Sequence, residues 1–220
     1  MRAVVLALTV MAIAACRSGE QPGASPTSTP TPQPTIDLST VVDAYKPEFD
    51  SSPAIPGVYV PPNPGIDGRL LTRDDILHLD PGVHYPLCSA ENISANRIAG
   101  CYNSNPPTSG PHAAAPAAFK VFDFAVPKEN LVHNMEHGGV VIWYGPTTNA
   151  AAVSTLTRLA LDAEAAGRLV VMSPYPDLEP DPIALTSWTR LDKFKSSELT
   201  EKRVTDFIGG NERRFNPEGF

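Results

Sequence analysis

The sequence predicts an α+β domain over residues 57–220, with a twisted, mixed β-sheet and two main helices on one face. Val140–Tyr144 is a β-branched and aromatic run, typical of a buried strand. Residues 150–166 repeat apolar side chains at helical spacing, and residues 168–173, Arg-Leu-Val-Val-Met-Ser, are predicted to form a second strand. Strand, helix and strand with short connections predict a parallel crossover unit within one domain.

Residues 1–15 are predicted to be a lipoprotein signal peptide. Arg2 is followed by an apolar run that ends at Ala15 and is shorter than the roughly 20 residues of a membrane-spanning helix. Residues 13–16 read Ile-Ala-Ala-Cys, which resembles the lipobox of bacterial lipoproteins. That resemblance implies cleavage before Cys16, acylation of its sulfur, and a lipid anchor in the cell membrane, with the protein on the extracytoplasmic face. An ordinary secretory signal with an incidental cysteine is the alternative.

Residues 16–56 are predicted to form a disordered, lipid-anchored linker rich in Pro, Thr and Ser. Five prolines lie between Pro22 and Pro34, and aliphatic periodicity is almost absent. Such a segment buries too little apolar surface to fold by itself. The alternative is that its later part packs on the domain, where Phe49 and Tyr59 could dock.

The cysteine count agrees with export. Apart from Cys16, the chain has Cys88 and Cys101, an even pair for an oxidising compartment. A disulfide between them would close a loop of about 14 residues and add roughly 3 kcal/mol of stability in the chain-entropy model. Paired thiolate metal ligands are the alternative, although these would favour a closer spacing.

Shorter patterns predict the remaining elements. Thr72 could cap one helical turn that runs to Leu79. Thr148 or Asn149 caps the helix at residues 150–166, and Gly167 stands where that helix stops. Further short strands are predicted at residues 83–87, 98–102, 183–190 and the end of 113–126, and a final helix at residues 197–208.

The charge pattern argues against nucleic-acid binding. Loss of residues 1–15 removes Arg2, so the formal net charge of −7 becomes −8 (−7 − 1). The basic residues are scattered and offer neither a stripe for nucleic acid nor a polybasic patch for anionic lipid. The chain also has no phosphate loop or dinucleotide fingerprint, and Ser109 lacks the surroundings of a nucleophile elbow.

Two stretches concentrate the histidines. Residues 133–139 read His-Asn-Met-Glu-His-Gly-Gly, directly before the predicted strand at Val140. Residues 102–112 form a loop by composition, which prolines stiffen and which ends in His112. The simplest interpretation of these stretches is a histidine-lined metal site. The alternative is that the histidines are buried, hydrogen-bonded groups that brace loops.

His133, Glu136 and His137 also match the zinc-protease pattern H-x-x-E-H. That chemistry needs a helix, whereas two glycines and a predicted strand follow at once and argue against a long helix. In an extended segment, both histidines would share a face with Met135, and imidazoles with a thioether suit copper. The spacing alone leaves the geometry open.

The two stretches together resemble the domain of unknown function 3105 family. The resemblance rests on Tyr102 with Asn-Pro-Pro-Thr-Ser-Gly-Pro-His at residues 105–112, and on Leu-Val-His-Asn-Met-Glu-His-Gly-Gly-Val-Val at residues 131–141. It covers a family core of about residues 84–208. It implies a bacterial protein that is exported or membrane-anchored, and no established activity carries over.

By position, the resemblance implies a set of metal ligands and supporting residues. The ligands are His84, His112, His133 and His137, supported by Glu136 and Tyr102. Glu136 would hold one imidazole in its correct tautomer. His78 falls outside both stretches and is expected at the surface or at a helix end. Copper is preferred over zinc, because the site is rich in histidine and poor in cysteine.

The function predicted from the sequence is that of a lipid-anchored extracytoplasmic protein that binds a transition metal ion. One alternative is an envelope hydrolase with Glu136 as general base. Another is an interaction module whose histidines are structural. The sequence favours a binding protein over an enzyme and names no protein partner.

Overall fold

The computed structural model describes residues 51–64, 78–178 and 182–215. The predicted signal peptide at residues 1–15, Cys16 and most of the predicted linker lie outside these residues, as does most of the helical turn predicted from Thr72. Every described residue belongs to one compact unit. None of the described helices combines the length and apolarity that a membrane crossing requires.

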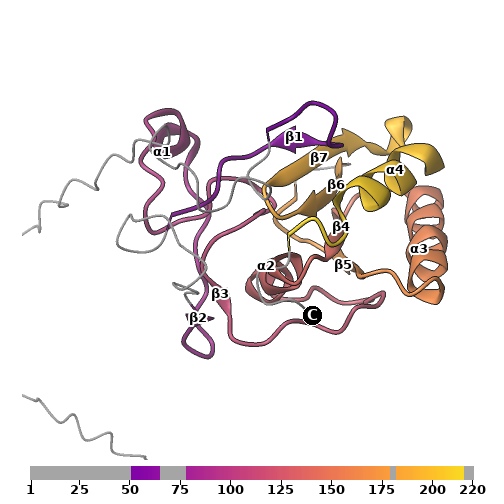
Figure 1. Ribbon diagram of the computed structural model, residues 1–220, viewed down its shortest axis with the longest axis horizontal. Helices are drawn as coiled ribbons and strands as arrows, with labels where there is room; N and C mark the ends of the chain where they lie inside the picture. The colour runs from indigo at the N-terminus through magenta and orange to yellow at the C-terminus, as the bar shows by residue number, and fades with distance from the viewer. Residues whose placement is uncertain (1–50, 65–77, 179–181, 216–220) are drawn as a thin grey trace, which may run out of the picture. The chain divides into compact units, whose positions relative to one another are not determined.

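The described residues form a five-stranded sheet, a two-stranded ribbon and four α-helices (Figure 1). The strands are β1 (Val58–Tyr59), β2 (His78–Leu79), β3 (His112–Ala113), β4 (Val140–Tyr144), β5 (Val170–Pro174), β6 (Pro182–Ser187) and β7 (Arg190–Lys195). The helices are α1 (Ala90–Ser94), α2 (Lys128–Glu136), α3 (Ala150–Ala165) and α4 (Glu201–Asn211), with a 3₁₀ turn at Ser196–Glu198.

The larger sheet is mixed, as predicted. Its strand order is β1-β7-β6-β4-β5. Strands β4 and β5 pair in parallel through the α3 crossover, whereas β1, β6 and β7 join by antiparallel pairing. The α+β class and the central crossover unit are therefore confirmed.

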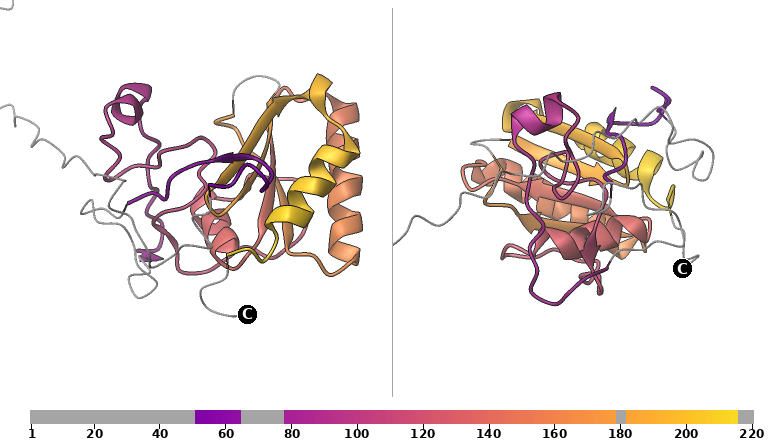
Figure 2. Two further views of the ribbon diagram at one scale, coloured as in Figure 1. Left: turned by 45° about the horizontal axis from the view of Figure 1, so that its top comes forward. Right: turned by 90° about the vertical axis from the view of Figure 1, so that its left-hand side faces the viewer.

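Alternation along β4 separates two layers of core. Val140 and Ile142 pack with α3 and α4, whereas Val141 and Trp143 pack with α2 on the other side. Figure 2 shows α3 and α4 together on one face of the sheet and α2 on the opposite face. The two main helices predicted for one face are thus α3 and α4, and α2 is an additional helix that the sequence analysis did not predict.

The ends of α3 and α4 follow from local chemistry. Asn149 accepts a hydrogen bond from the Ala152 N–H at 2.8 Å, and Gly167 follows α3 with φ of 72°, so both predicted ends of this helix are confirmed. α4 begins later than predicted, because Thr200 is its cap and accepts from the Arg203 N–H at 3.2 Å. Residues 196–198 form the separate 3₁₀ turn instead.

Several short predicted strands are wrong. Residues 83–87 and 98–102 are irregular and pair only at a bridge between Leu87 and Tyr102. Residues 114–126, after β3, are irregular with a single bridge from Val121. Residues 183–190 hold most of β6, a turn and the first residue of β7. A short apolar run can be buried in the core without forming a strand, because a strand also needs a partner strand for its backbone hydrogen bonds.

The predicted disulfide between Cys88 and Cys101 is present, with Cα atoms 5.0 Å apart. α1 lies in the loop that it closes, and Ser89 caps this short helix by accepting from the Asn92 N–H. The disulfide holds this loop beside Tyr102, which begins the segment that leads to His112.

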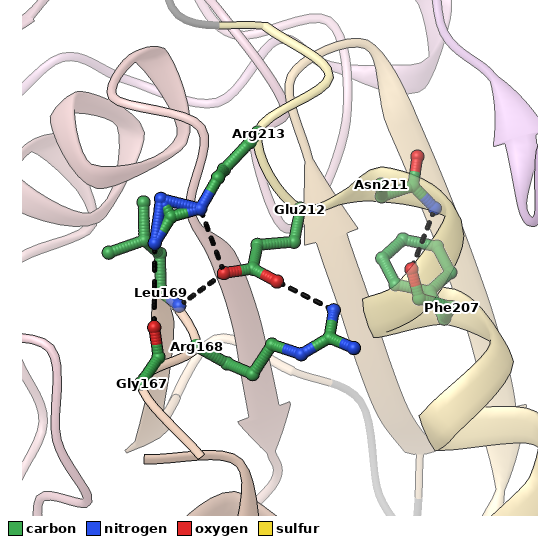
Figure 3. Close-up of polar contacts among 7 residues, drawn as sticks. All are labelled: Gly167, Arg168, Leu169, Phe207, Asn211, Glu212 and Arg213. Carbon is green, nitrogen blue, oxygen red and sulfur yellow. Dashed lines mark hydrogen bonds and ion pairs between the residues drawn. The ribbon is translucent and has the colours of Figure 1, made fainter. Parts of the chain in front are cut away.

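The residues after α4 form hydrogen bonds with the residues directly before β5 (Figure 3). The buried Glu212 carboxylate accepts from the Leu169 N–H at 2.8 Å and from Arg168 Nη1 at 2.7 Å. Arg213 in turn donates its N–H to the Gly138 carbonyl at 2.8 Å. The C-terminal segment therefore braces the junction between α2 and β4, next to the histidines.

Candidate metal centre

α2 carries the histidine motif. Its residues Leu131, Val132 and Met135 are fully buried against the sheet, and the helix ends at Glu136 because Gly138 takes a φ of 80°. The extended alternative for this segment is wrong. His133 and Glu136 lie one helical turn apart, and His137 forms the C-cap, with its N–H donating to the His133 carbonyl at 3.1 Å.

The two-stranded ribbon brings a second pair of histidines together. β2 and β3 are parallel, and their register places His78 opposite His112 and Leu79 opposite Ala113. Residues opposite each other in a ladder share a face, so both imidazoles lie on the same side of the ribbon. Their ring centroids are 5.3 Å apart.

Four side chains from α2 and the ribbon converge. His78, His112, His133 and Glu136 each offer one ligand atom, and these atoms lie within 4.8 Å of one another. The His112 ring lies 4.9 Å from the His133 ring, and the His78 ring 5.4 Å from it. Three of the four residues are buried, and only His78 is exposed. Because donors of one ion are roughly 3–4 Å apart, small side-chain rotations suffice to close a coordination sphere.

Backbone carbonyls fix the tautomer of two of these rings. His112 Nδ1 lies 2.8 Å from the Gly110 oxygen, and His133 Nδ1 lies 2.6 Å from the Ala113 oxygen. A carbonyl oxygen only accepts, so each Nδ1 carries a proton, and in the neutral form of each ring Nε2 is the lone pair. This arrangement is usual for metal-binding histidines.

His112 and Glu136 face each other in the buried part of the cluster. His112 Nε2 is 3.0 Å from Glu136 Oε2, and the two side chains are only 1% and 6% exposed. Neither atom has an aligned hydrogen bond to another described group. Two acceptors at this distance repel each other unless a proton or metal ion lies between them.

The pKa values of Glu136 and His133 both lie below their ordinary values, for different reasons. Burial raises the pKa of Glu136, but the neighbouring imidazoles of His112, His133 and His137 lower it by more. The net pKa is below the ordinary value, so the carboxylate stays ionised. Burial lowers the pKa of His133 despite its bond to Ala113, which favours the neutral ring. An ionised carboxylate and a neutral imidazole are the forms that bind metal ions.

His137 lies beside the four-donor set. Its Nε2 is 2.7 Å from His133 Nε2, and the two rings stack with centroids 4.6 Å apart. Since His133 presents a lone pair, His137 donates its Nε2 proton there when no ion is bound. It is therefore placed to hold the His133 ring, or to become a further ligand by rotation.

The structure places the other predicted site residues differently. The His84 side chain is 73% exposed, and its Nδ1 lies 3.6 Å from Glu129 Oε2, outside the cluster. A turn closed by the Val83 N–H on the Asp80 carbonyl directs the chain away after β2. Tyr102 supports the cluster through the backbone, because its hydroxyl donates to the Pro111 carbonyl at 2.5 Å, directly before His112.

His78 is the member of the cluster that the sequence analysis assigned to the surface. It is exposed, but it reaches the site through a parallel ladder of only two residue pairs. No local pattern marks so short a strand, and its partner His112 is far along the chain. Only the three-dimensional pairing identifies it.

Comparison with known proteins identifies a protein family. A family model described as protein of unknown function (DUF3105) matches residues 96–219, which is more than half of the chain. The match contains His112, His133, Glu136 and His137, whereas His78 and His84 precede it. No curated protein and no solved structure matches the chain. The chain belongs to the family of proteins of unknown function designated DUF3105.

Proposed function

We propose that this protein binds a divalent transition metal ion through His78, His112, His133 and Glu136. The observation that carries the proposal is the buried pair of facing acceptors, His112 Nε2 and Glu136 Oε2, which have no aligned hydrogen bond among the described residues. Burying such groups without a partner is costly, and one cation satisfies both. The same ion also engages the inward lone pair of His133.

A proton shared between His112 and Glu136 is the competing explanation. It would satisfy two atoms and make the pair a structural brace. It gives no reason for His78 to lie over His133 and His112, since an exposed imidazole gains little there. A metal ion uses all four side chains, and this favours the metal over the proton.

For the ion we propose copper(II) first and zinc second. Imidazole and carboxylate donors suit both ions, and copper(II) binds a given site more tightly in the general order of affinities. Met135 lies in the apolar core with Leu131 and Val132, outside the donor set. A thioether-bound copper(I) site is therefore not part of the proposal.

We also propose that the domain functions outside the cytoplasm, held at the membrane by lipid on Cys16. The sequence of residues 1–16 supports this, and the disulfide between Cys88 and Cys101 suits an oxidising compartment. In cells fed labelled palmitate, the chain should take up label and sediment with membranes. Cys16→Ser should abolish both, whereas a labelled C16S protein would contradict lipidation at this residue.

The metal proposal is tested with the full chain, purified without a histidine tag and titrated with copper(II) and with zinc(II). Elemental analysis after desalting should give one equivalent per chain. His112→Ala and His133→Ala should each lose it, and His78→Ala should weaken binding. His84→Ala is the matched control and should retain the full equivalent, because His84 lies outside the cluster.

Circular dichroism establishes that each variant is folded. A folded His112→Ala/His133→Ala double variant that still holds one equivalent would contradict the proposed ligands. A wild-type chain that takes up neither metal would leave the shared proton as the explanation of the buried pair.

A further inference from the structure

A second hollow lies beside the metal centre, in the described part of the chain. It is bordered by the turn after β2, the segment after β3 and the first turn of α2, and it has a volume of about 290 Å³. Leu79 and Ala113 in its wall directly follow His78 and His112, so the ribbon separates it from the cluster. None of the four proposed metal ligands lines it.

The wall contains a buried carboxylate with one unused oxygen. Glu129 Oε1 accepts from the Tyr85 N–H at 2.9 Å and pairs with Lys128 Nζ at 2.9 Å. Glu129 Oε2 has no hydrogen-bond partner among the described residues, although the side chain is only 3% exposed. The exposed His84 ring lies 3.6 Å from this oxygen and is free to rotate into solvent. Because a buried acceptor is normally hydrogen-bonded, this oxygen is expected to accept from a donor outside the protein.

The charged groups around the hollow favour a positively charged donor. The acidic Asp80 and Glu129 line the hollow, whereas no lysine or arginine does. Lys128 pairs with Oε1 of Glu129, and the amino-terminal end of α2 adds a partial positive charge of about half a unit. Together these positive charges are smaller than the charge of the two carboxylates. The other walls are mainly apolar and include Leu79, Val83 and Pro127.

We propose that this hollow, which we call the Glu129 pocket, binds a primary ammonium group carried on a short apolar body. The ammonium donates to Glu129 Oε2 and replaces the His84 contact, and the apolar part lies along Leu79 and Pro127. A volume of 290 Å³ is at the small end for ligand sites, so it limits the body to a few carbon atoms or one or two small residues. This proposal does not rest on the metal site.

The test is an NMR titration of the ¹⁵N-labelled full chain in detergent with n-butylammonium. The Tyr85 amide, which donates to Glu129, should shift saturably, together with the amide of Ala115 in the pocket wall. Ala114→Leu fills the pocket at an exposed wall position and should abolish the shifts. Ala118→Leu, exposed and outside the pocket wall, is the matched control and should leave them unchanged.

The same titration tests which ligand charge the pocket prefers and whether the ammonium belongs to a free amine or to a peptide amino terminus. Butyrate should give no saturable shift, and Glu129→Gln should remove the preference for butylammonium over butanol. Alanyl-alanine amide presents the same ammonium on a peptide. Tighter binding than butylammonium would identify an amino terminus as the ligand, and weaker binding would identify a free small amine.

The absence of any saturable shift with butylammonium would overturn the proposal, as would equal shifts in Ala114→Leu or with butyrate. Because His112 and His133 are unchanged in every variant, failure here leaves the metal proposal intact. Conversely, loss of metal binding predicts no change in this titration.

Discussion

At the scale of single residues, two backbone carbonyls determine what the histidines can do. The oxygens of Gly110 and Ala113 hold the Nδ1 protons of His112 and His133, and both rings therefore turn Nε2 inward. The sequence analysis could identify the imidazoles, because the motif is dense in them. The orientation of the imidazole rings could not be predicted, because it depends on backbone carbonyls whose positions do not depend on residue type.

Tyr102 provides a test of how this geometry is maintained. Tyr102→Phe removes the hydrogen bond to the Pro111 carbonyl and should lower metal affinity by about 10- to 100-fold, as loss of supporting groups around metal ligands does. Tyr175→Phe is the matched control, because the buried Tyr175 hydroxyl has no hydrogen-bond partner among the described residues. Competition titrations against a chelator measure both affinities. Equal affinities in the two variants would contradict the supporting role of Tyr102.

Glu129 gives the chain a defined dependence of stability on pH. Burial raises its pKa, but Lys128, the backbone N–H of Glu129 itself and the Tyr85 N–H lower it more, so the folded-state pKa lies below its ordinary value. The ionised carboxylate therefore stabilises the fold above the unfolded-state pKa of about 4.3, and this stability is lost as pH falls through the folded-state pKa. Urea unfolding should show Glu129→Gln less stable than wild type at about pH 7, with the difference shrinking at low pH.

The control for that measurement is Glu164→Gln, at an exposed position on α3, which should differ little from wild type at either pH. A Glu129→Gln variant that matched wild type at neutral pH would show that the buried carboxylate contributes nothing.

At the scale of elements, the short connection between α2 and β4 positions the motif. Gly138 has a φ of 80°, and Gly139 packs so closely that an added Cβ would lie 2.6 Å from the Asn134 oxygen. These glycines argue against a long helix through the motif, and the short α2 does end just before them. α2 is nine residues long and almost wholly buried, so it shows none of the one-sided apolar periodicity that revealed α3.

Two glycine substitutions should therefore act in opposite directions. Gly139→Ala drives a methyl group into backbone and should cost about 1–3 kcal/mol of unfolding free energy. Gly209→Ala lies within α4 with open space around it and should stabilise by about 0.5–1 kcal/mol. Denaturant unfolding followed by circular dichroism measures both changes. A stabilising Gly139→Ala would mean that the junction is looser than described.

At the scale of the whole molecule, the site combines elements that sequence patterns predict with elements that they do not predict. β4, α3 and β5 follow from long local patterns, and they make the rigid support for α2. The ribbon of β2 and β3 arises from two residue pairs that no pattern could predict. This is why residue patterns alone single out His112, His133, His137 and Glu136 but also His84, whereas the three-dimensional pairing brings His78 into the cluster and leaves His84 outside it.

Because the proposed ligands come from α2 and from both strands of the ribbon, metal binding should stabilise the whole domain. A ligand that binds only the folded state stabilises it by about 2.7 kcal/mol at 100 times its dissociation constant. Copper(II) or zinc(II) should raise the thermal midpoint, and a chelator should reverse the change. His78→Ala should reduce the gain and His84→Ala should not; equal gains in both would remove His78 from the site.

The most direct test of the metal centre is a crystal structure of the metal-loaded protein, with anomalous scattering recorded at the absorption edge of the bound metal. The account predicts one anomalous peak about 2.0–2.2 Å from donor atoms of His78, His112, His133 and Glu136. A peak at His84 and Glu129, or a loaded crystal in which these four side chains surround no metal, would contradict it.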